Sequence, residues 1–161
     1  MLICLEKQKK DAYLPSLFNL FYENMHTVAP SGLTYDQEKA LWLAEVSPAM
    51  DKPARQVVMV WMDDVLAGYV QYYIREKMLM IEELQIKKEY QKTLLFHRLC
   101  KHLLSVVPKD LQTIEAYAHK QNENSIHMMQ KLGMEVCDPD PDSPFVHMKG
   151  VVGKIRTFLK K

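Results

Sequence analysis

The sequence predicts a mixed α+β domain, three layers around one largely antiparallel sheet, with elements in the order β-α-α-β-β-β-α-β-α-β-β. Three observations predict it. Apolar segments rich in β-branched and aromatic residues follow one another through short connections over residues 56–86, as in an antiparallel meander. A helical pattern and a further strand at residues 113–118 then form a β-α-β unit. Residues 122–152 have the pattern of one capped helix followed by two strands.

The N-terminal part is predicted to hold one strand and two helices. Residues 2–5 are apolar enough for a first strand, and apolar residues recur at helical spacing from Leu14 onward. Pro15 is expected to confine the start of that helix. The second helix is expected to begin at the capping-box spacing Thr34–Gln37 and to end at the breaker segment 47–53.

The middle of the chain is predicted to hold the meander and its crossover. Its three strands are residues 56–62, 65–74 and 78–86. A helix from Leu95 is expected to end at Pro108, and strand 113–118 follows it. Because a strand, a helix and a strand form a right-handed crossover, strands 78–86 and 113–118 should be neighbours and parallel.

The C-terminal part is predicted to begin with a short helix. The Asn122 side chain can cap it, and Gly133 can take the left-handed conformation that ends it. Strands 134–138 and 145–152 should follow, joined by a proline-rich loop. Residues 153–161 have the pattern of an amphipathic helix docked on its own domain, with these residues on one face: Ile155, Phe158 and Leu159. No repeat is visible, so residues 1–161 are expected to form a single domain.

Composition restricts the partners that can be expected. Among 161 residues, 21 are basic and 20 acidic, so a net charge of +1 gives no case for nucleic acid or a membrane surface. The N-terminal apolar stretch is too short for a secretory signal, and we expect a cytoplasmic protein. Cys4, Cys100 and Cys137 are widely spaced, and they are expected to be small buried residues or inert thiols. The six histidines are scattered, so no metal site is expected.

Two segments carry a family resemblance. "IEELQIKKEYQKTLLFHRL" lies on the third meander strand and the crossover helix, and "NENSIHMMQKLGMEV" lies near the end. Together with the order of elements they resemble the GNAT superfamily of acyl-CoA-dependent N-acyltransferases, over roughly residues 55–137. The resemblance implies that the two parallel strands splay apart, and that acetyl-CoA is the cofactor. It further implies that these residues hold the cofactor: Leu84, Gln85, Ile86, Gln91, Lys92, Thr93, Leu94, Leu95, Phe96, Asn122, Ser125 and Met129.

The chain departs from the family pattern in two places. Leu94 and Phe96 stand where the pyrophosphate-binding turn usually has small residues, and a bulky side chain there could crowd the phosphates. Met129 stands where many relatives carry a tyrosine that protonates the leaving thiolate, and methionine has no proton to donate. Tyr117 and His119, at the end of the neighbouring strand, are candidate stand-ins.

The general base is expected to be Glu82. Strand alternation places Glu82 on one face and Glu83 on the other with Gln85, and relatives with an acidic pair often use the first carboxylate through a water. A carboxylate on a solvated strand face is the competing interpretation. The expected reaction is acetyl transfer to a primary amine, on a small molecule or a peptide. An inactive domain that binds CoA or another ligand, and an interaction module, remain alternatives, and a homodimer stays open.

Overall fold

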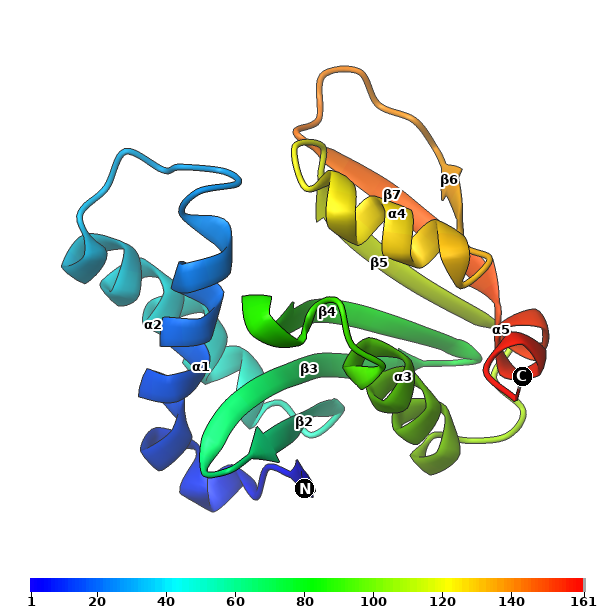
Figure 1. Ribbon diagram of the computed structural model, residues 1–161, viewed down its shortest axis with the longest axis horizontal. Coiled ribbons are helices and arrows are strands. Elements are labelled where there is room, and N and C mark those ends of the chain that lie inside the picture. The colour runs from blue at the N-terminus through cyan, green and yellow to red at the C-terminus, as the bar shows by residue number, and fades with distance from the viewer. Residues whose placement is uncertain (161) are drawn as a thin grey trace. The chain divides into compact units, whose positions relative to one another are not determined.

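The structure is a computed structural model that describes residues 1–160 (Figure 1). The helices and 3-10 turns are η1 (Lys7–Lys9), α1 (Lys10–Met25), α2 (Tyr35–Asp51), η2 (Lys88–Tyr90), α3 (Leu95–Val106), α4 (Glu123–Lys131) and α5 (Val152–Phe158). The strands are β1 (Leu2–Cys4), β2 (Arg55–Met62), β3 (Val65–Arg75), β4 (Met78–Ile86), β5 (Thr113–His119), β6 (Glu135–Cys137) and β7 (Phe145–Val151). The predicted order of elements is confirmed.

The seven strands form one sheet in the order β1-β2-β3-β4-β5-β7-β6. Strand β1 pairs antiparallel with β2, and β5 pairs antiparallel with β7. Strands β4 and β5 are parallel, and their register runs from the pair Met78–Thr113 to the pair Ile81–Ala116. The largely antiparallel sheet with one parallel pair confirms the predicted fold class.

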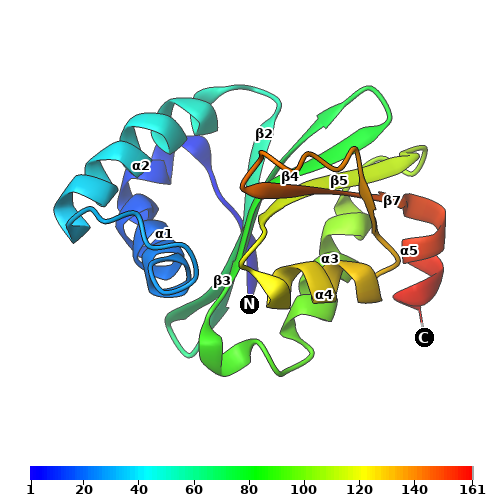
Figure 2. The same ribbon diagram turned by 90° about the horizontal axis from the view of Figure 1, so that it is seen from above.

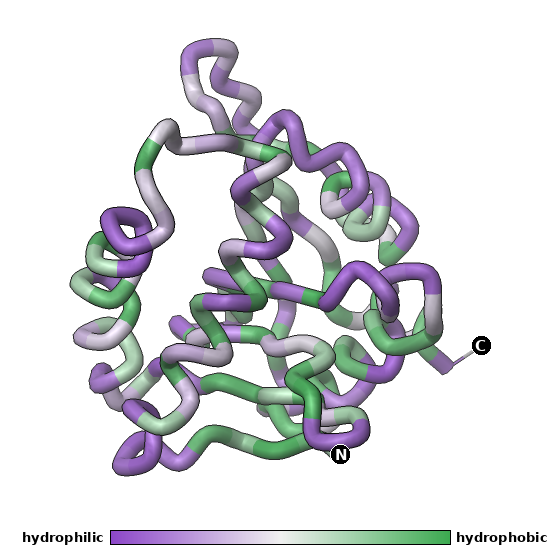
Figure 3. The backbone as a smooth tube through the Cα atoms, turned by 60° about the vertical axis from the view of Figure 1, so that its left-hand side comes forward, coloured by the Kyte–Doolittle hydropathy of each residue, from purple (hydrophilic) through white to green (hydrophobic). Residues whose placement is uncertain are grey.

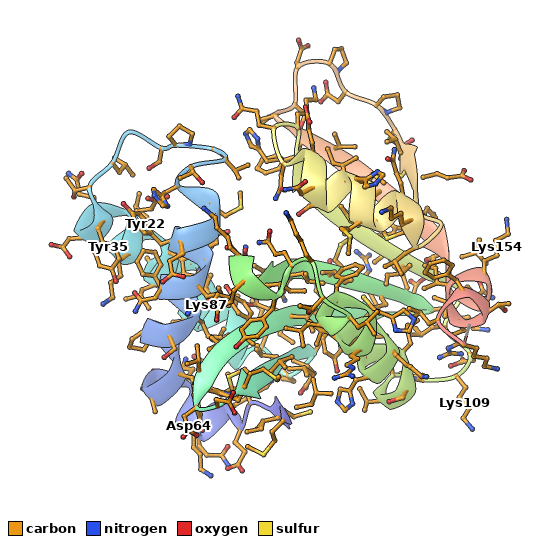
Figure 4. The ribbon with its side chains drawn as sticks, in the orientation of Figure 1. Tyr22, Tyr35, Asp64, Lys87, Lys109 and Lys154 are labelled. Atoms are coloured by element: carbon orange, nitrogen blue, oxygen red, sulfur yellow. The ribbon has the colours of Figure 1, made fainter. Side chains whose placement is uncertain are left out.

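The chain divides into two compact units, which are described separately. The first unit comprises Met1–Tyr72 and Glu83–Leu95. Its helices α1 and α2 pack side by side (Figure 2), and the core contains Leu17, Phe18, Trp42, Met59 and Tyr69. Aromatic rings join the two helices, since the rings of Tyr22 and Tyr35 meet edge to face at 5.0 Å (Figure 4). Figure 3 shows hydrophobic colour along the strands and mostly hydrophilic colour in the turns, as burial of the strands requires.

One helix boundary differs from the prediction because a proline is accommodated inside the helix. Helix α1 begins at Lys10, so Pro15 lies within it rather than near its start. Helix α2 ends at Asp51, within the predicted segment 47–53, and Pro48 lies inside it. Proline removes one backbone hydrogen bond, but its fixed φ is helical. Burial of apolar residues on both helices outweighs that loss. The capping box at Thr34 is confirmed, with the Gln37 N–H donating to the Thr34 hydroxyl.

The second unit comprises Tyr73–Glu82 and Phe96–Lys161. Here β5, β7 and β6 are adjacent strands with α4 beside them (Figure 1), and Met148 of β7 is fully buried. Helix α5 is docked on this unit as expected, because Ile155 is buried and the Arg156 guanidinium donates to the carbonyls of Leu104, Pro108 and Lys109. Phe158 is 44% exposed, so its predicted place on the buried face is wrong. Residue 161 of the predicted segment lies outside the described residues.

Within the described residues 1–160, no helix is both long enough and apolar enough to cross a membrane.

Candidate active site

The end of β4 is held by an amide cluster, which we define as Asn24, Gln85 and Gln91. The Asn24 amide donates to the Gln85 side-chain oxygen and to the Ile86 carbonyl, both at 2.9 Å. The Gln91 amide donates to the same Ile86 carbonyl at 2.8 Å. Because a carbonyl oxygen has two lone pairs, these two donors fill its capacity, and the Ile86 carbonyl has none left for a ligand. The strand and the following turn are thus fixed to each other and to α1.

Glycine is required where β3 passes this cluster. A Cβ at Gly68 would lie 2.9 Å from the Gln85 carbonyl oxygen, closer than real Cβ contacts. The neighbouring Ala67 carbonyl accepts from the Lys87 N–H at 2.9 Å, just beyond the end of β4. The backbones of β3 and β4 therefore approach closely at the end of β4.

The adjacent carboxylates of β4 have different surroundings. Glu82 is exposed, whereas Glu83 is half-buried and accepts a hydrogen bond from the Tyr69 hydroxyl. Tyr69 is fully buried, and this burial raises the pKa of its phenol well above the ordinary value, with the Glu83 carboxylate raising it further. Glu83 thus has a structural partner on β3, and Glu82 is the carboxylate at the surface.

The turn before α3 combines caps with exposed side chains. The Thr93 hydroxyl donates to the Tyr90 carbonyl at 2.7 Å and accepts from the Leu95 N–H at 3.2 Å, which satisfies one donor of the first helical turn. Leu94 is 68% exposed, and both Leu95 and Phe96 are buried. Of the two bulky residues at the small positions of this turn, only Leu94, the one predicted to crowd the phosphates, therefore lies at its surface. Three lysines supply positive charge near it, Lys87, Lys88 and Lys92, the first of which is labelled in Figure 4.

The second unit contains the remaining predicted residues. The Asn122 side chain accepts from the Ser125 N–H at 3.2 Å, so the predicted cap of α4 is confirmed. Met129 is half-buried, and its carbonyl accepts from the Met134 N–H. Gly133 has a φ of 87°, the left-handed conformation expected at the end of this helix.

The two candidate proton donors on β5 are both engaged. The Tyr117 ring stacks on the His147 ring with centroids 4.5 Å apart, although the side chain stays 57% exposed. The His119 Nδ1 accepts from the Gln121 N–H, and its ring meets Phe145 edge to face. Each side chain is thus positioned by a neighbour within the second unit.

A charged cluster, defined as Glu115, His147 and Lys149, lies on one face of β5 and β7. The His147 Nε2 lies 2.9 Å from one Glu115 carboxylate oxygen, and the Lys149 ammonium lies 3.1 Å from the other. Burial raises the pKa of Glu115, but hydrogen bonds from Lys149 and His147 outweigh it and hold the pKa below its usual value. On β6, burial and the nearby carboxylates of Asp138 and Glu115 raise the pKa of the Cys137 thiol.

Several of these residues were not predicted from the sequence. Gly68 offered a signal, since glycine inside a strand marks a close backbone approach. Asn24 and Tyr69 offered none, because their partners are far away in the sequence. Of the cysteines expected to be buried or inert, Cys100 is buried, with its pKa raised to about 12 by burial, whereas Cys4 is exposed and Cys137 is half-buried.

Comparisons with known proteins identify the family and the fold. Residues 14–134 match the model of the acetyltransferase (GNAT) family, which extends the match to both N-terminal helices. Two solved structures with bound coenzyme A share the fold: PaiA N-acetyltransferase from Thermoplasma acidophilum (TM-score 0.71, 14% identity, 94% of this chain and 99% of that chain) and an aminoglycoside 6'-N-acetyltransferase (TM-score 0.72, 14% identity, 94% and 97%). Aminoglycoside 6'-acetyltransferase type Ii has a TM-score of 0.70 at 17% identity, covering 94% and 97% of the two chains. No curated protein matches the sequence.

Proposed function

Since the chain belongs to the acetyltransferase (GNAT) family, we propose that it transfers an acetyl group from acetyl-CoA to a primary amine. The observation that carries this proposal is the anchoring of β4 to the following turn by the amide cluster. It holds the strand end and the turn that follows it in fixed geometry, as a site that binds its cofactor largely through backbone groups requires.

The cofactor is assigned to the strand end and the turn. Backbone groups of Leu84 would pair with the pantetheine arm. The Gln85 carbonyl lies against β3 and the Ile86 carbonyl already accepts two hydrogen bonds, so both would serve only to shape the strand. N–H groups at the start of α3 and the nearby lysines would hold the pyrophosphate, because a helix N-terminus favours an anion. The residues on α4, among them Asn122, Ser125 and Met129, keep the cofactor role that the family implies.

Glu82 is assigned as the general base. Its carboxylate is exposed and able to take a proton through a water, whereas that of Glu83 is tied to a buried phenol. The amine nitrogen attacks the thioester carbonyl, the new C–N bond forms as the C–S bond breaks, and CoA leaves as a thiolate. The amine proton passes to Glu82, and Met129 cannot protonate the thiolate, so that proton comes from solvent or another acid.

Exposed Leu94 favours a second function. A large apolar side chain at the turn is expected to oppose close approach of phosphates, and it supports the alternative of a domain that binds weakly or not at all. Leu94→Ala tests this, because removal of an exposed side chain should change stability by less than about 0.5 kcal/mol. Tighter binding of acetyl-CoA by this variant would show that the leucine crowds the turn, and unchanged affinity would show that it does not.

A thermal shift with acetyl-CoA tests the proposal. At a hundredfold excess over the dissociation constant, a ligand that binds only the folded state stabilises it by about 2.7 kcal/mol, which raises Tm by several degrees. Equal concentrations of dephospho-CoA and ATP serve as controls for the pantetheine and nucleotide parts. No shift with acetyl-CoA in large excess would overturn both cofactor-binding functions and leave the interaction module.

The base assignment has its own test. Glu82→Gln keeps the shape of the side chain and removes the basic oxygen, so kcat on an accepted amine should fall by about a hundredfold or more near neutral pH. Glu83→Gln is the matched control, since the amide oxygen still accepts from Tyr69. A polyamine, amino acid and peptide panel supplies the acceptor. Full activity of Glu82→Gln with loss in Glu83→Gln would reverse the assignment.

A further inference from the structure

Three metal-ligating side chains meet on the last hairpin, which contains none of the residues assigned to the cofactor. The sulfur of Cys137 lies 3.1 Å from the Nδ1 of His147, and one carboxylate oxygen of Asp138 lies 3.7 Å from the same nitrogen. One donor atom from each residue falls within 4.8 Å of the others. We propose that these three residues form a zinc-binding site, with its fourth position left to water.

The sheet register explains why the side chains meet. Strands β6 and β7 lie side by side (Figure 1) and are antiparallel. In their register Cys137 is directly opposite His147. Opposed side chains project to the same face and their Cβ atoms lie close together. Asp138 follows with a φ of 47°, a left-handed conformation that turns the chain at the end of β6 and that aspartate tolerates better than most residues. The three donors are thus placed by backbone geometry.

A second observation points independently to a ligand on His147. Its Nε2 lies 2.9 Å from the Glu115 carboxylate, which accepts the proton of that nitrogen. The lone pair of neutral imidazole is then on Nδ1, the nitrogen that faces Cys137 and Asp138. A carboxylate that accepts the distal N–H of a histidine is the usual support of metal-bound imidazole, because it fixes the tautomer and the ring orientation. Stacking of Tyr117 on the ring restricts it further.

The donor types and spacing fit zinc. Thiolate, imidazole and carboxylate are its ligands, and with Zn–S near 2.3 Å and Zn–N near 2.0–2.1 Å a tetrahedral ion holds sulfur and nitrogen about 3.5 Å apart. The present 3.1 Å separation opens to that value with a small side-chain rotation. The Asp138 carboxylate is 90% exposed and free to close on the ion. On binding, the metal would take the place of the Cys137 thiol proton, and that proton would be released to solvent.

The competing arrangement needs no metal. His147 could be an imidazolium between the Glu115 and Asp138 carboxylates, with Cys137 a bystander. The two arrangements differ in what Cys137 does, because only the zinc site requires its sulfur.

Zinc and cobalt titrations of the untagged full chain, with a non-chelating reductant, test the proposal. Calorimetry should show one zinc ion per chain, and cobalt should give the near-ultraviolet charge-transfer absorption of a thiolate ligand. Cys137→Ser should abolish that absorption, and Asp138→Asn should weaken zinc binding. Glu115→Gln should weaken it by about 10- to 100-fold, the usual effect of removing such a support. Cys4→Ser, which removes an exposed thiol elsewhere, is the control and should leave both signals unchanged.

Each outcome decides the question. Absence of saturable zinc uptake by folded wild-type protein overturns the site, and so does uptake that survives in both Cys137→Ser and Asp138→Asn. If Cys137→Ser fails to fold, exposed Asp138 still provides a variant that should fold, and its zinc affinity is decisive. Acetyl-CoA binding is measured in parallel, so that loss of the proposed transferase function is distinguished from loss of the metal site.

Discussion

The amide cluster at the end of β4 and the charged cluster on β5 and β7 both satisfy buried polar atoms, but by different means. Asn24, Gln85 and Gln91 are neutral, and two of them act on one backbone carbonyl. Glu115, His147 and Lys149 are ionisable and act on one another's side chains. Neutral amides fix the backbone at any ordinary pH or salt concentration. The strength of paired charges changes with both pH and salt concentration, so such a cluster is able to respond to the binding of a proton or a cation.

The largest effect is expected for Asn24→Asp, which replaces the amide cluster's donor by a carboxylate. Both Asn24 donors face acceptors, so the new carboxylate would face the Gln85 and Ile86 oxygens in a buried site. The free energy of unfolding should fall by about 3 kcal/mol near neutral pH, measured by urea denaturation. Asn19→Asp is the matched control on the same helix, since that side chain is exposed and accepts from Tyr35. Similar losses in both variants would refute the donor role of Asn24.

A smaller loss is expected for Gly68→Ala, which tests the backbone approach beside the amide cluster. The added Cβ meets the Gln85 carbonyl at 2.9 Å, and backbone cannot move aside as a flexible side chain does. We expect about 2 kcal/mol of destabilisation, together with weaker acetyl-CoA binding because β4 must shift. Gly153→Ala is the control, since a Cβ there meets nothing within 4 Å. If Gly68→Ala bound acetyl-CoA with unchanged affinity, the close contact between the β3 and β4 backbones would play no part in cofactor binding.

Tyr69→Phe should cost about 1–1.5 kcal/mol at neutral pH, because it removes a hydrogen bond to the Glu83 carboxylate. The pKa of Tyr69 is raised in the folded state, so its contribution is full below the ordinary value near 10 and declines as pH rises above it. Wild type should therefore lose stability between about pH 9.5 and 11 more steeply than Tyr69→Phe. Equal slopes in that range, measured by denaturant unfolding, would contradict the burial of this phenol.

The smallest effect is expected in the charged cluster. Lys149 is half exposed, so Lys149→Met should cost only about 0.5 kcal/mol at low salt. In 1 M salt, where the screening length is about 3 Å, that difference should largely vanish. The loss in Asn24→Asp should persist at least in part, because its cause is buried. If Lys149→Met lost the same stability at low and at high salt, the charged cluster would not differ from the amide cluster in its response to salt.

Local patterns predicted much of the fold, whereas the site depends on contacts between distant segments. The meander, the crossover, the capping box and the Asn122–Gly133 helix follow from spacings of a few residues, which is why they were predicted correctly. The effect of Pro15 on the start of α1 was misjudged, because tertiary burial overrides a local penalty. The pairing of Cys137 with His147 depends on hairpin register across a proline-rich loop. A separation of ten residues does not reveal it.

The division of the chain falls within β4, between Glu82 and Glu83. Glu83 belongs to the same unit as Tyr69, whose hydroxyl donates to it, and Glu82 belongs to the unit that contains β5. Local opening of the two units is expected to have different free energies, since cooperative segments of a protein exchange separately. Amide hydrogen exchange should then show a step in protection along a single strand. The step would coincide with Glu82, so the exchange of its amide would report directly on the strand position that we propose to carry the general base.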